Sequence, residues 1–351
     1  MRVGIVGLPN AGKSSLFNLL TDAAARVDSY PFTTIDRNVG VVTVPDARLE
    51  EIGRLLAPEK TTPAHVDFVD IAGLVKGASK GEGLGNRFLG HVREADLILH
   101  LVRDFTSPDA AHVFDTVDPQ RDAEVVEQEL AIADIETVER RLEHLRKEPK
   151  SAEREHLLPA LEKLAAVLSR GFVLPELHAD ERAALAPLHL FVTKPLLYAI
   201  NCSDSTPADP GRYPRLVEHG AVLISCALEQ AAQDFPQDEK VELRESLQLH
   251  PHGPAALVEQ GFAMLDLIRF YTVKGTESRA WAAPRGTTAL GAAAMIHSDL
   301  AEGFIKAEVV TFADLAQAGG YHTARDTGRV KVEGKNYVVQ DGDVLLIRFR
   351  N

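Results

Sequence analysis

Val3-Gly4-Ile5-Val6-Gly7-Leu8-Pro9-Asn10-Ala11-Gly12-Lys13-Ser14-Ser15 is the stretch that decides the fold of this chain. A short apolar run leads into G-x-x-x-x-G-K-S, and a helix-compatible stretch follows the motif. The glycines let successive backbone N–H groups curl round one phosphate, and the helix N-terminus adds a positive dipole. In this motif the lysine contacts the β- and γ-phosphates and the serine hydroxyl ligates Mg²⁺. The stretch therefore predicts a strand, a phosphate-binding loop and a helix, with nucleotide contacts from Asn10, Ala11, Gly12, Lys13, Ser14 and Ser15.

Short apolar runs continue beyond this motif and alternate with helical stretches. Strands are expected at residues 3–6, 39–44, 66–69, 97–102, 196–200 and 221–224. Strands that alternate with helices are typical of a mostly parallel sheet that is covered on both faces. The predicted fold class is α/β, a P-loop NTPase domain.

Two further segments carry residues suited to a metal and a γ-phosphate. Thr33 and Thr34 offer hydroxyls on a loop, and a threonine there can bind Mg²⁺ only when the γ-phosphate is present. Asp70 ends a strand as the first residue of D-x-x-G, so it is expected to hold Mg²⁺ through water, while the Gly73 N–H meets the γ-phosphate.

The residue after D-x-x-G is Leu74, where Ras-type enzymes have a glutamine that orients the attacking water. A leucine side chain cannot hydrogen-bond to water, so hydrolysis must be slow or must use another group. His112 follows the strand at 97–102 and is a candidate for that role. An ordinary solvated loop histidine is the alternative.

A long helical insertion separates the strands at 97–102 and 196–200. Ile135, Val138, Leu142 and Leu145 form one apolar stripe, and Leu157, Leu161, Leu164 and Leu168 form a second. Residues 148–151 break the helix between them, and Pro159 either kinks the second helix or marks its start. The pattern predicts an antiparallel helical hairpin that projects from the sheet domain.

From residue 268 the pattern changes to short β-rich runs with one helix. Strands are expected at 270–273, 308–311, 336–339 and 344–349, and the helix at 288–296. Residues 268–351 carry 11 Lys+Arg and 9 Asp+Glu, a net charge of +2, whereas the remainder carries 27 − 42 = −15. Because this part is the less acidic one, it is the better candidate for contacts with a phosphate backbone. Candidate contacts are Lys274, Arg279, Arg285 and Lys306, with Trp281 as a stacking surface.

At this point the motifs at 7–14, 30–34 and 70–85 resemble those of the Obg-like ATPases, the YchF subfamily of the TRAFAC P-loop proteins. The resemblance extends over essentially the whole chain. It implies a nucleotide-binding domain at 1–117 and 191–267, an inserted coiled-coil arm at 118–190, and a C-terminal β-grasp (TGS-like) domain at 268–351. It also implies Thr34 as the Mg²⁺ ligand, a hydrophobic residue in place of the glutamine, ribosome binding, and hydrolysis of ATP in preference to GTP.

The base site departs from that family in two places. GTPases use N-K-x-D, whose aspartate accepts two N–H groups of guanine, and the family has N-x-x-E instead. This chain has Asn201-Cys202-Ser203-Asp204, which lacks the lysine but keeps an aspartate. Ser225-Cys226-Ala227-Leu228-Glu229 lies where the family has S-A-K-x-E, so a second lysine is absent. ATP is the favoured nucleotide because the stacking lysine is missing. GTP remains the alternative, because Asp204 can still accept the N–H groups of guanine.

The composition excludes several other classes of protein. The chain has 351 residues, 25% of them charged, and a net charge of −13, so a general nucleic-acid coat protein is not expected. Its two cysteines give no disulfide framework, and they are either buried fillers or sites of oxidation at the base. No apolar run is long enough for a membrane span, and a cytoplasmic protein is expected. Two functions stay open: a slow ATPase (or GTPase) switch that reports to the ribosome, through ribosomal RNA or protein, and a nucleotide-gated binding module with negligible turnover.

Overall fold

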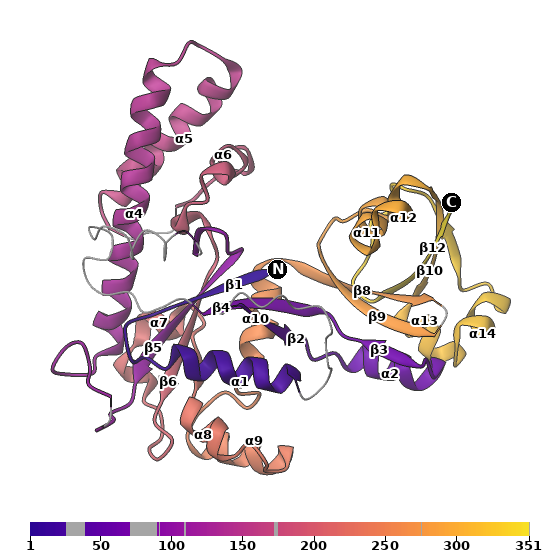
Figure 1. Ribbon diagram of the computed structural model, residues 1–351, viewed down its shortest axis with the longest axis horizontal. Helices are drawn as coiled ribbons and strands as arrows, with labels where there is room; N and C mark the ends of the chain where they lie inside the picture. Colours follow the sequence, from indigo (N-terminus) through magenta and orange to yellow (C-terminus); the bar gives the residue numbers. More distant parts are fainter. Residues whose placement is uncertain are drawn as a thin grey trace. The chain divides into compact units, whose positions relative to one another are not determined.

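The computed structural model describes residues 1–25, 39–70, 90, 92–108, 110–171, 175–274 and 276–350 (Figure 1). It separates into two units. The first contains Met1–Val42 and Asp67–Leu257, and the second contains Thr43–Val66 and Val258–Asn351. The division expected from the sequence kept residues 43–66 with the nucleotide-binding domain, whereas here they group with the C-terminal unit.

The first unit is built on a six-stranded sheet with the order β2-β4-β1-β5-β6-β7. Its strands are β1 (Arg2–Val6), β2 (Val39–Thr43), β4 (His65–Asp70), β5 (Leu97–Asp104), β6 (Leu196–Cys202) and β7 (Val222–Ile224). The pairings of β1 with β4 and β5, of β5 with β6, and of β6 with β7 are parallel. Each of the six strands predicted for this part overlaps one of these. Every residue of β5 and β6 is buried, as parallel strands covered on both faces require.

Parallel strands bring their carboxyl ends to one edge of the sheet, where ligands bind in open α/β folds. β1 ends at Val6, directly before the glycine-rich turn, and α1 (Lys13–Ala25) follows that turn. The register pairs Ile5 with Asp70. β6 ends at Cys202 on the same edge. Among the described residues, the other α-helices of this unit outside the hairpin are α6 (Ala179–Leu185), α7 (Pro214–Glu218), α8 (Cys226–Ala231) and α9 (Gln237–Ser246), while α10 (Ala255–Met264) spans the border of the two units.

The predicted helical hairpin is confirmed as α4 (Pro119–Lys147) and α5 (Ala152–Leu168), seen in magenta in Figure 1. α4 contributes to two cores. Its first half packs Ala123, Val126 and Leu130 into the core of the sheet domain. Its second half packs Val138, Leu142 and Leu145 against the apolar stripe of α5. Pro159 lies inside α5 and does not mark its start.

The second unit has a mixed sheet with the order β11-β10-β12-β8-β9-β3. The strands are β3 (Lys60–Thr62), β8 (Leu267–Lys274), β9 (Glu277–Pro284), β10 (Phe304–Thr311), β11 (Lys331–Glu333) and β12 (Asp343–Phe349). β8 and β12 are parallel, and α11 (Ala289–Ile296) packs on the core, as in a β-grasp domain. The other helices of the unit are α2 (Ala47–Leu56), α12 (Ser298–Glu302), α13 (Phe312–Ala318) and α14 (Tyr321–Asp326).

The strand predicted at 336–339 is wrong. Its alternating pattern reflects burial of Tyr337 and Val339 against the core, but the backbone there bonds to the start of α11. The Ala289 N–H donates to Tyr337 O and the Val339 N–H donates to Thr287 O, so no strand ladder forms beyond one bridge of Val338 with Thr288.

Residues 43–66 are fixed in the second unit by both backbone and side chains. β3 pairs in parallel with β9. The Asp46 carboxylate caps α2 and accepts a 2.8 Å hydrogen bond from the Tyr271 hydroxyl. The Arg48 guanidinium donates two hydrogen bonds, of 2.7 and 3.3 Å, to the Asp341 carboxylate. Among the described residues no helix is both long and apolar enough to cross a membrane.

Candidate functional site

The glycine-rich turn after β1 has a backbone that only glycine allows at its two ends. Gly7 has φ +155°, and an added Cβ would lie 2.3 Å from the Leu101 carbonyl oxygen. Gly12 has φ +97°, and an added Cβ would lie 2.4 Å from Asn201 Nδ2. The buried Lys13 ammonium donates to Leu8 O (2.8 Å) and Gly7 O (3.1 Å), which curls the side chain back over the loop. The backbone of this loop is thus shaped as a cradle for an anion.

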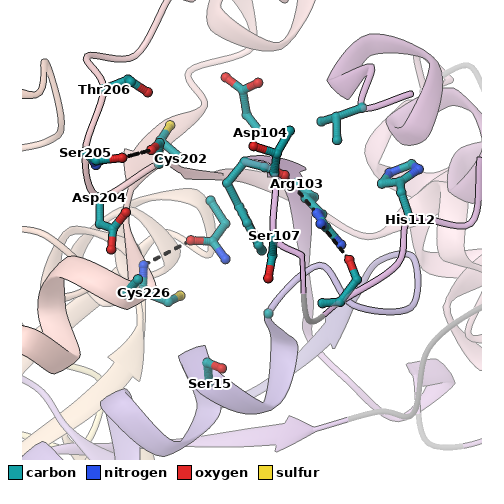
Figure 2. Close-up of a pocket in the computed structure, with 18 of the residues that line it drawn as sticks. Ser15, Arg103, Asp104, Ser107, His112, Cys202, Asp204, Ser205, Thr206 and Cys226 are labelled. Atoms are coloured by element: carbon teal, nitrogen blue, oxygen red, sulfur yellow. Dashed lines mark hydrogen bonds between the residues drawn. The ribbon is translucent and has the colours of Figure 1, made fainter. Parts of the chain in front are cut away.

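Asn201 joins three segments of the site. Its side-chain amide donates to Ala11 O (3.0 Å), and its Oδ1 accepts the Cys226 N–H (3.0 Å). The second bond is the dashed line beside Cys226 in Figure 2. Asn201 is 3% exposed, so both bonds form away from solvent. The loop after β1, the end of β6 and the start of α8 are therefore held together by one side chain.

Ser225 serves α8 as its N-cap. Its hydroxyl accepts the Leu228 N–H at 3.3 Å, and the residue is fully buried. A serine oxygen at this position satisfies one of the first N–H groups of the helix. The sequence predicted a nucleotide contact at Ser225, whereas the described side chain supports the loop that carries Cys226.

A pocket of about 970 Å³ opens between these segments. Gly12 and Ser15 line it, and Asp204 and His112 lie on opposite sides of it in Figure 2. Ligand pockets in proteins are typically about 300–1,000 Å³, so a nucleotide is well within its size. Besides these residues, the predicted nucleotide contacts Asn201, Cys202 and Cys226 line it.

Arg103 is a residue of this site that the sequence analysis missed. It is 3% exposed and sits at the end of β5. Its guanidinium donates to Asn10 O (3.3 Å), Ala110 O (2.9 Å) and Phe105 O (2.9 Å) and stacks on the Phe105 ring. Asn10 adds a second link, because its side-chain amide donates to Ala111 O (2.9 Å). These bonds connect the loop after β5 to the phosphate-binding loop. No local sequence motif predicts them.

His112 lies on that same loop and lines the pocket. Its side chain is 6% exposed, so it is not a solvated loop residue. Its Nδ1 lies 3.0 Å from both the backbone nitrogen and the carbonyl oxygen of Phe114, and its Nε2 lies 2.7 Å from Asp122 Oδ2. The carboxylate oxygen beside Nε2 assigns a proton to that nitrogen, which donates to Asp122.

The two cysteines at the base loops are buried thiols. Burial raises the pKa of both Cys202 and Cys226 to about 12. The Cys202 thiol donates to Ile200 O at 3.6 Å. A thiol with so high a pKa stays protonated at neutral pH and is a poor nucleophile, which favours the filler role over oxidation.

The predicted metal ligands are only partly within view. Thr34 lies outside the described residues, as do the predicted catalytic residues Gly73 and Leu74, and of Asp70 only the backbone is described, at the end of β4. Ser14 occupies the first turn of α1. Hydroxyl and carboxylate oxygens are ligands that Mg²⁺ prefers, so Ser14 and Asp70 suit that ion. No cluster of three or more His, Cys, Asp or Glu side chains suited to a metal occurs within the described ranges.

In the second unit, Trp281 is not a free stacking surface. The Arg279 guanidinium lies 4.2 Å from the ring, and Phe270 stacks with it at 6.2 Å. Arg285 is paired with Asp266 at 2.7 Å. Two of the cations expected to contact a phosphate backbone thus already have partners in the protein. The Arg279 guanidinium stacks on the Trp281 ring, and Arg285 forms an ion pair with Asp266.

Comparison with known proteins gives concordant results over the whole chain. A family model described as "50S ribosome-binding GTPase" matches residues 2–149, and the YchF-GTPase_C model, described as "Protein of unknown function (DUF933)", matches residues 267–350. The chain is 41% identical to a Bacillus subtilis protein named "Ribosome-binding ATPase YchF" and 39% identical to one of that name from Escherichia coli O157:H7, with 99% of each chain covered. A solved structure of the Schizosaccharomyces pombe YchF GTPase is similar with a TM-score of 0.85 and 31% identity, covering 99% of this chain and 97% of that one.

Proposed function

This chain belongs to the YchF family, and from that premise we propose that it is an Mg²⁺-dependent nucleoside triphosphatase that hydrolyses ATP to ADP and phosphate. The observation that carries the proposal is the single bridge through Asn201, which ties the phosphate-binding loop to both base loops around one pocket. Its relatives carry "ATPase" in their names. A nucleotide can occupy such a pocket with its phosphates on the loop and its base beside Asp204.

Each predicted residue has a role in this proposal. Lys13, released from its bonds to Gly7 O and Leu8 O, neutralises the β- and γ-phosphates. Ser14, Thr34 and Asp70 would hold Mg²⁺, which would supply positive charge against the phosphate oxygens when bound. The Gly73 N–H contacts the γ-phosphate. Because the apolar Leu74 cannot hydrogen-bond to water, His112 assists the attack of water in its place.

ATP is the proposed nucleotide because the stacking lysine of the guanine motif is absent. Cys202 occupies that position, and its thiol is buried against Ile200 O. A GTPase is the second candidate, and one observation favours it. The exposed Asp204 lines the pocket, where a carboxylate can accept the N–H groups of guanine.

Ribosome binding is the proposed context, since the relatives are named ribosome-binding and a matching family model is described in the same terms. The hairpin of α4 and α5 and the less acidic second unit are the surfaces that we propose for ribosomal RNA or protein. Among the candidate cations, the half-buried Arg279 and the exposed Lys306 have no acidic partner among the described residues, whereas Arg285 is paired with Asp266. This proposal makes the chain a cytoplasmic protein.

Calorimetry with ATP and GTP in the presence of Mg²⁺ tests the base assignment. We expect ATP to bind more tightly, and a preference for GTP of tenfold, about 1.4 kcal/mol, contradicts it. Asp204→Ala should weaken GTP binding more than ATP binding, and Ser203→Ala, which changes a half-buried polar residue of the same pocket, is the matched control.

Single-turnover hydrolysis with and without ribosomes tests the enzyme against the binding module. Lys13→Ala should abolish hydrolysis and weaken nucleotide binding together. If the wild-type protein binds ATP tightly but shows no phosphate release under either condition, the nucleotide acts as a structural ligand and the ATPase proposal fails.

A further inference from the structure

The first turn of α4 holds the His112 ring in one position. Asp122 lies in that turn and is 3% exposed at its side chain. Its Oδ2 accepts the Nε2–H of His112 at 2.7 Å. On the other edge of the ring, the Phe114 N–H donates to Nδ1 at 3.0 Å. The ring is therefore fixed at both nitrogens by groups that belong to the protein.

A ring held in this way cannot act on water. A general base needs a nitrogen lone pair within about 2.6–3.2 Å of the proton that it takes. In His112 the Phe114 backbone occupies Nδ1, with its nitrogen and its carbonyl oxygen both at 3.0 Å, and Nε2 carries the proton that Asp122 accepts. Hydrolysis assisted by His112 therefore requires that one of these two hydrogen bonds breaks first.

The bond to Asp122 is the one whose rupture leaves the fewest groups unsatisfied. The Oδ1 atom of Asp122 accepts two further hydrogen bonds from Arg121, of 2.8 and 3.1 Å. Arg121 is anchored in turn by Thr116 O at 2.6 Å and by stacking on Phe114. After release of His112, the buried carboxylate would still have its cationic partner, so it would not become an unpaired buried charge.

We propose that Asp122 is a positioning residue that restrains hydrolysis by latching His112 to the first turn of α4. This inference rests on the proposed function, in which His112 assists the attack of water. α4 runs on into the helical hairpin, so the latch sits on the same helix that packs against α5. A ribosomal partner that displaces α4 would thus free the ring.

The test is single-turnover ATP hydrolysis by the full-length protein and its variants. Asp122→Ala should raise the rate at saturating ATP about tenfold, which corresponds to about 1.4 kcal/mol, and should leave the KM for ATP unchanged. Asp122→Asn keeps an oxygen that can accept the Nε2–H, so its increase should be smaller. Glu124→Ala is the matched control, because it removes an exposed carboxylate of the same helix that bonds only to Gln120 among the described residues.

The double variant His112→Gln/Asp122→Ala separates the latch from a general loosening of α4. It should show no acceleration over His112→Gln alone. If Asp122→Ala does not fold, Asp122→Asn decides the matter by the same comparison in the His112→Gln background. An unchanged or reduced rate in the Asp122 variants overturns the latch, provided that hydrolysis still depends on Lys13 and His112. Loss of that dependence would instead overturn the proposed function.

Discussion

Replacement of Asn201 by alanine should disable the pocket without touching a residue that contacts the phosphates. The variant removes a donor to Ala11 O and an acceptor for the Cys226 N–H, both at 3.0 Å and both buried. An orphaned buried polar group costs about 1–3 kcal/mol, so the two together cost about 2–6 kcal/mol in the first unit. The same bonds set the spacing of the phosphate loop and the base loop, and the pocket loses its preformed shape. We expect the Kd for ATP to rise at least about tenfold, or about 1.4 kcal/mol.

Calorimetry at one temperature measures the affinity, and urea denaturation followed by circular dichroism measures the stability. Asn201→Asp keeps the hydrogen bond from the Cys226 N–H but faces a carboxylate toward Ala11 O. Its ATP affinity and its stability should therefore lie below those of the wild type, either above or below those of Asn201→Ala. Ser203→Ala is the control in the same pocket. Wild-type ATP affinity in Asn201→Ala, together with reduced stability, would refute the reasoning, because the bridge would then support the fold and not the pocket.

Three further predictions concern buried groups of the first unit. Burial raises the pKa of Asp134 from 3.8 to about 6, so the native state holds the proton more tightly than the unfolded chain, and stability falls as pH rises through this range by up to about 3 kcal/mol. Asp134→Asn should flatten this pH dependence in urea denaturation between pH 4 and pH 8, and an unchanged slope would count against it. Cys202 and Cys226 should resist iodoacetamide at pH 8 in the native protein, with or without ATP, and react fully in denaturant. Rapid labelling of either cysteine in the native protein, measured by mass spectrometry, would contradict this prediction and favour oxidation at the base loops as their role. Leu161→Ala should cost about 2–5 kcal/mol in the hairpin, because the side chain is fully buried between α4 and α5, and should leave the Kd for ATP unchanged. Hydrogen exchange of residues 152–168 measures the loss, and equal protection in both proteins would contradict it.

The elements that the sequence predicted well are those whose signal is local. The strands at 3–6 and 97–102 are near-continuous apolar runs, and full burial in a parallel sheet demands such runs. The stripes of the hairpin repeat with the period of a helix, so the spacing of Leu161 and Leu164 alone is enough to assign them to a buried face. The phosphate loop is a motif in which each residue type has its own physical task.

The site residues that sequence reasoning missed depend on distant partners. Arg103 follows no recognisable motif, yet three carbonyl oxygens and an aromatic ring fix its guanidinium beside the phosphate loop. His112 could be placed on a loop near the site, but its carboxylate partner lies ten positions later on a helix that was assigned to the inserted arm. Whether a histidine is solvated, latched or free is decided by such a partner, and spacing along the chain does not reveal it.

Residues 43–66 show why a unit boundary is harder to predict than an element. α2 and β3 have ordinary local patterns, and nothing in them says which sheet they join. The choice is made by Asp46 with Tyr271, by Arg48 with Asp341 and by the pairing of β3 with β9, all contacts across more than 200 positions of sequence. This segment follows Thr34 by nine positions and precedes Asp70 by four, so it connects the two proposed metal-binding segments. Residues 43–66 are anchored in the second unit. If the two metal-binding segments rearrange around a γ-phosphate, the change must therefore either be absorbed in the few residues that separate them from 43–66 or reach 43–66 itself.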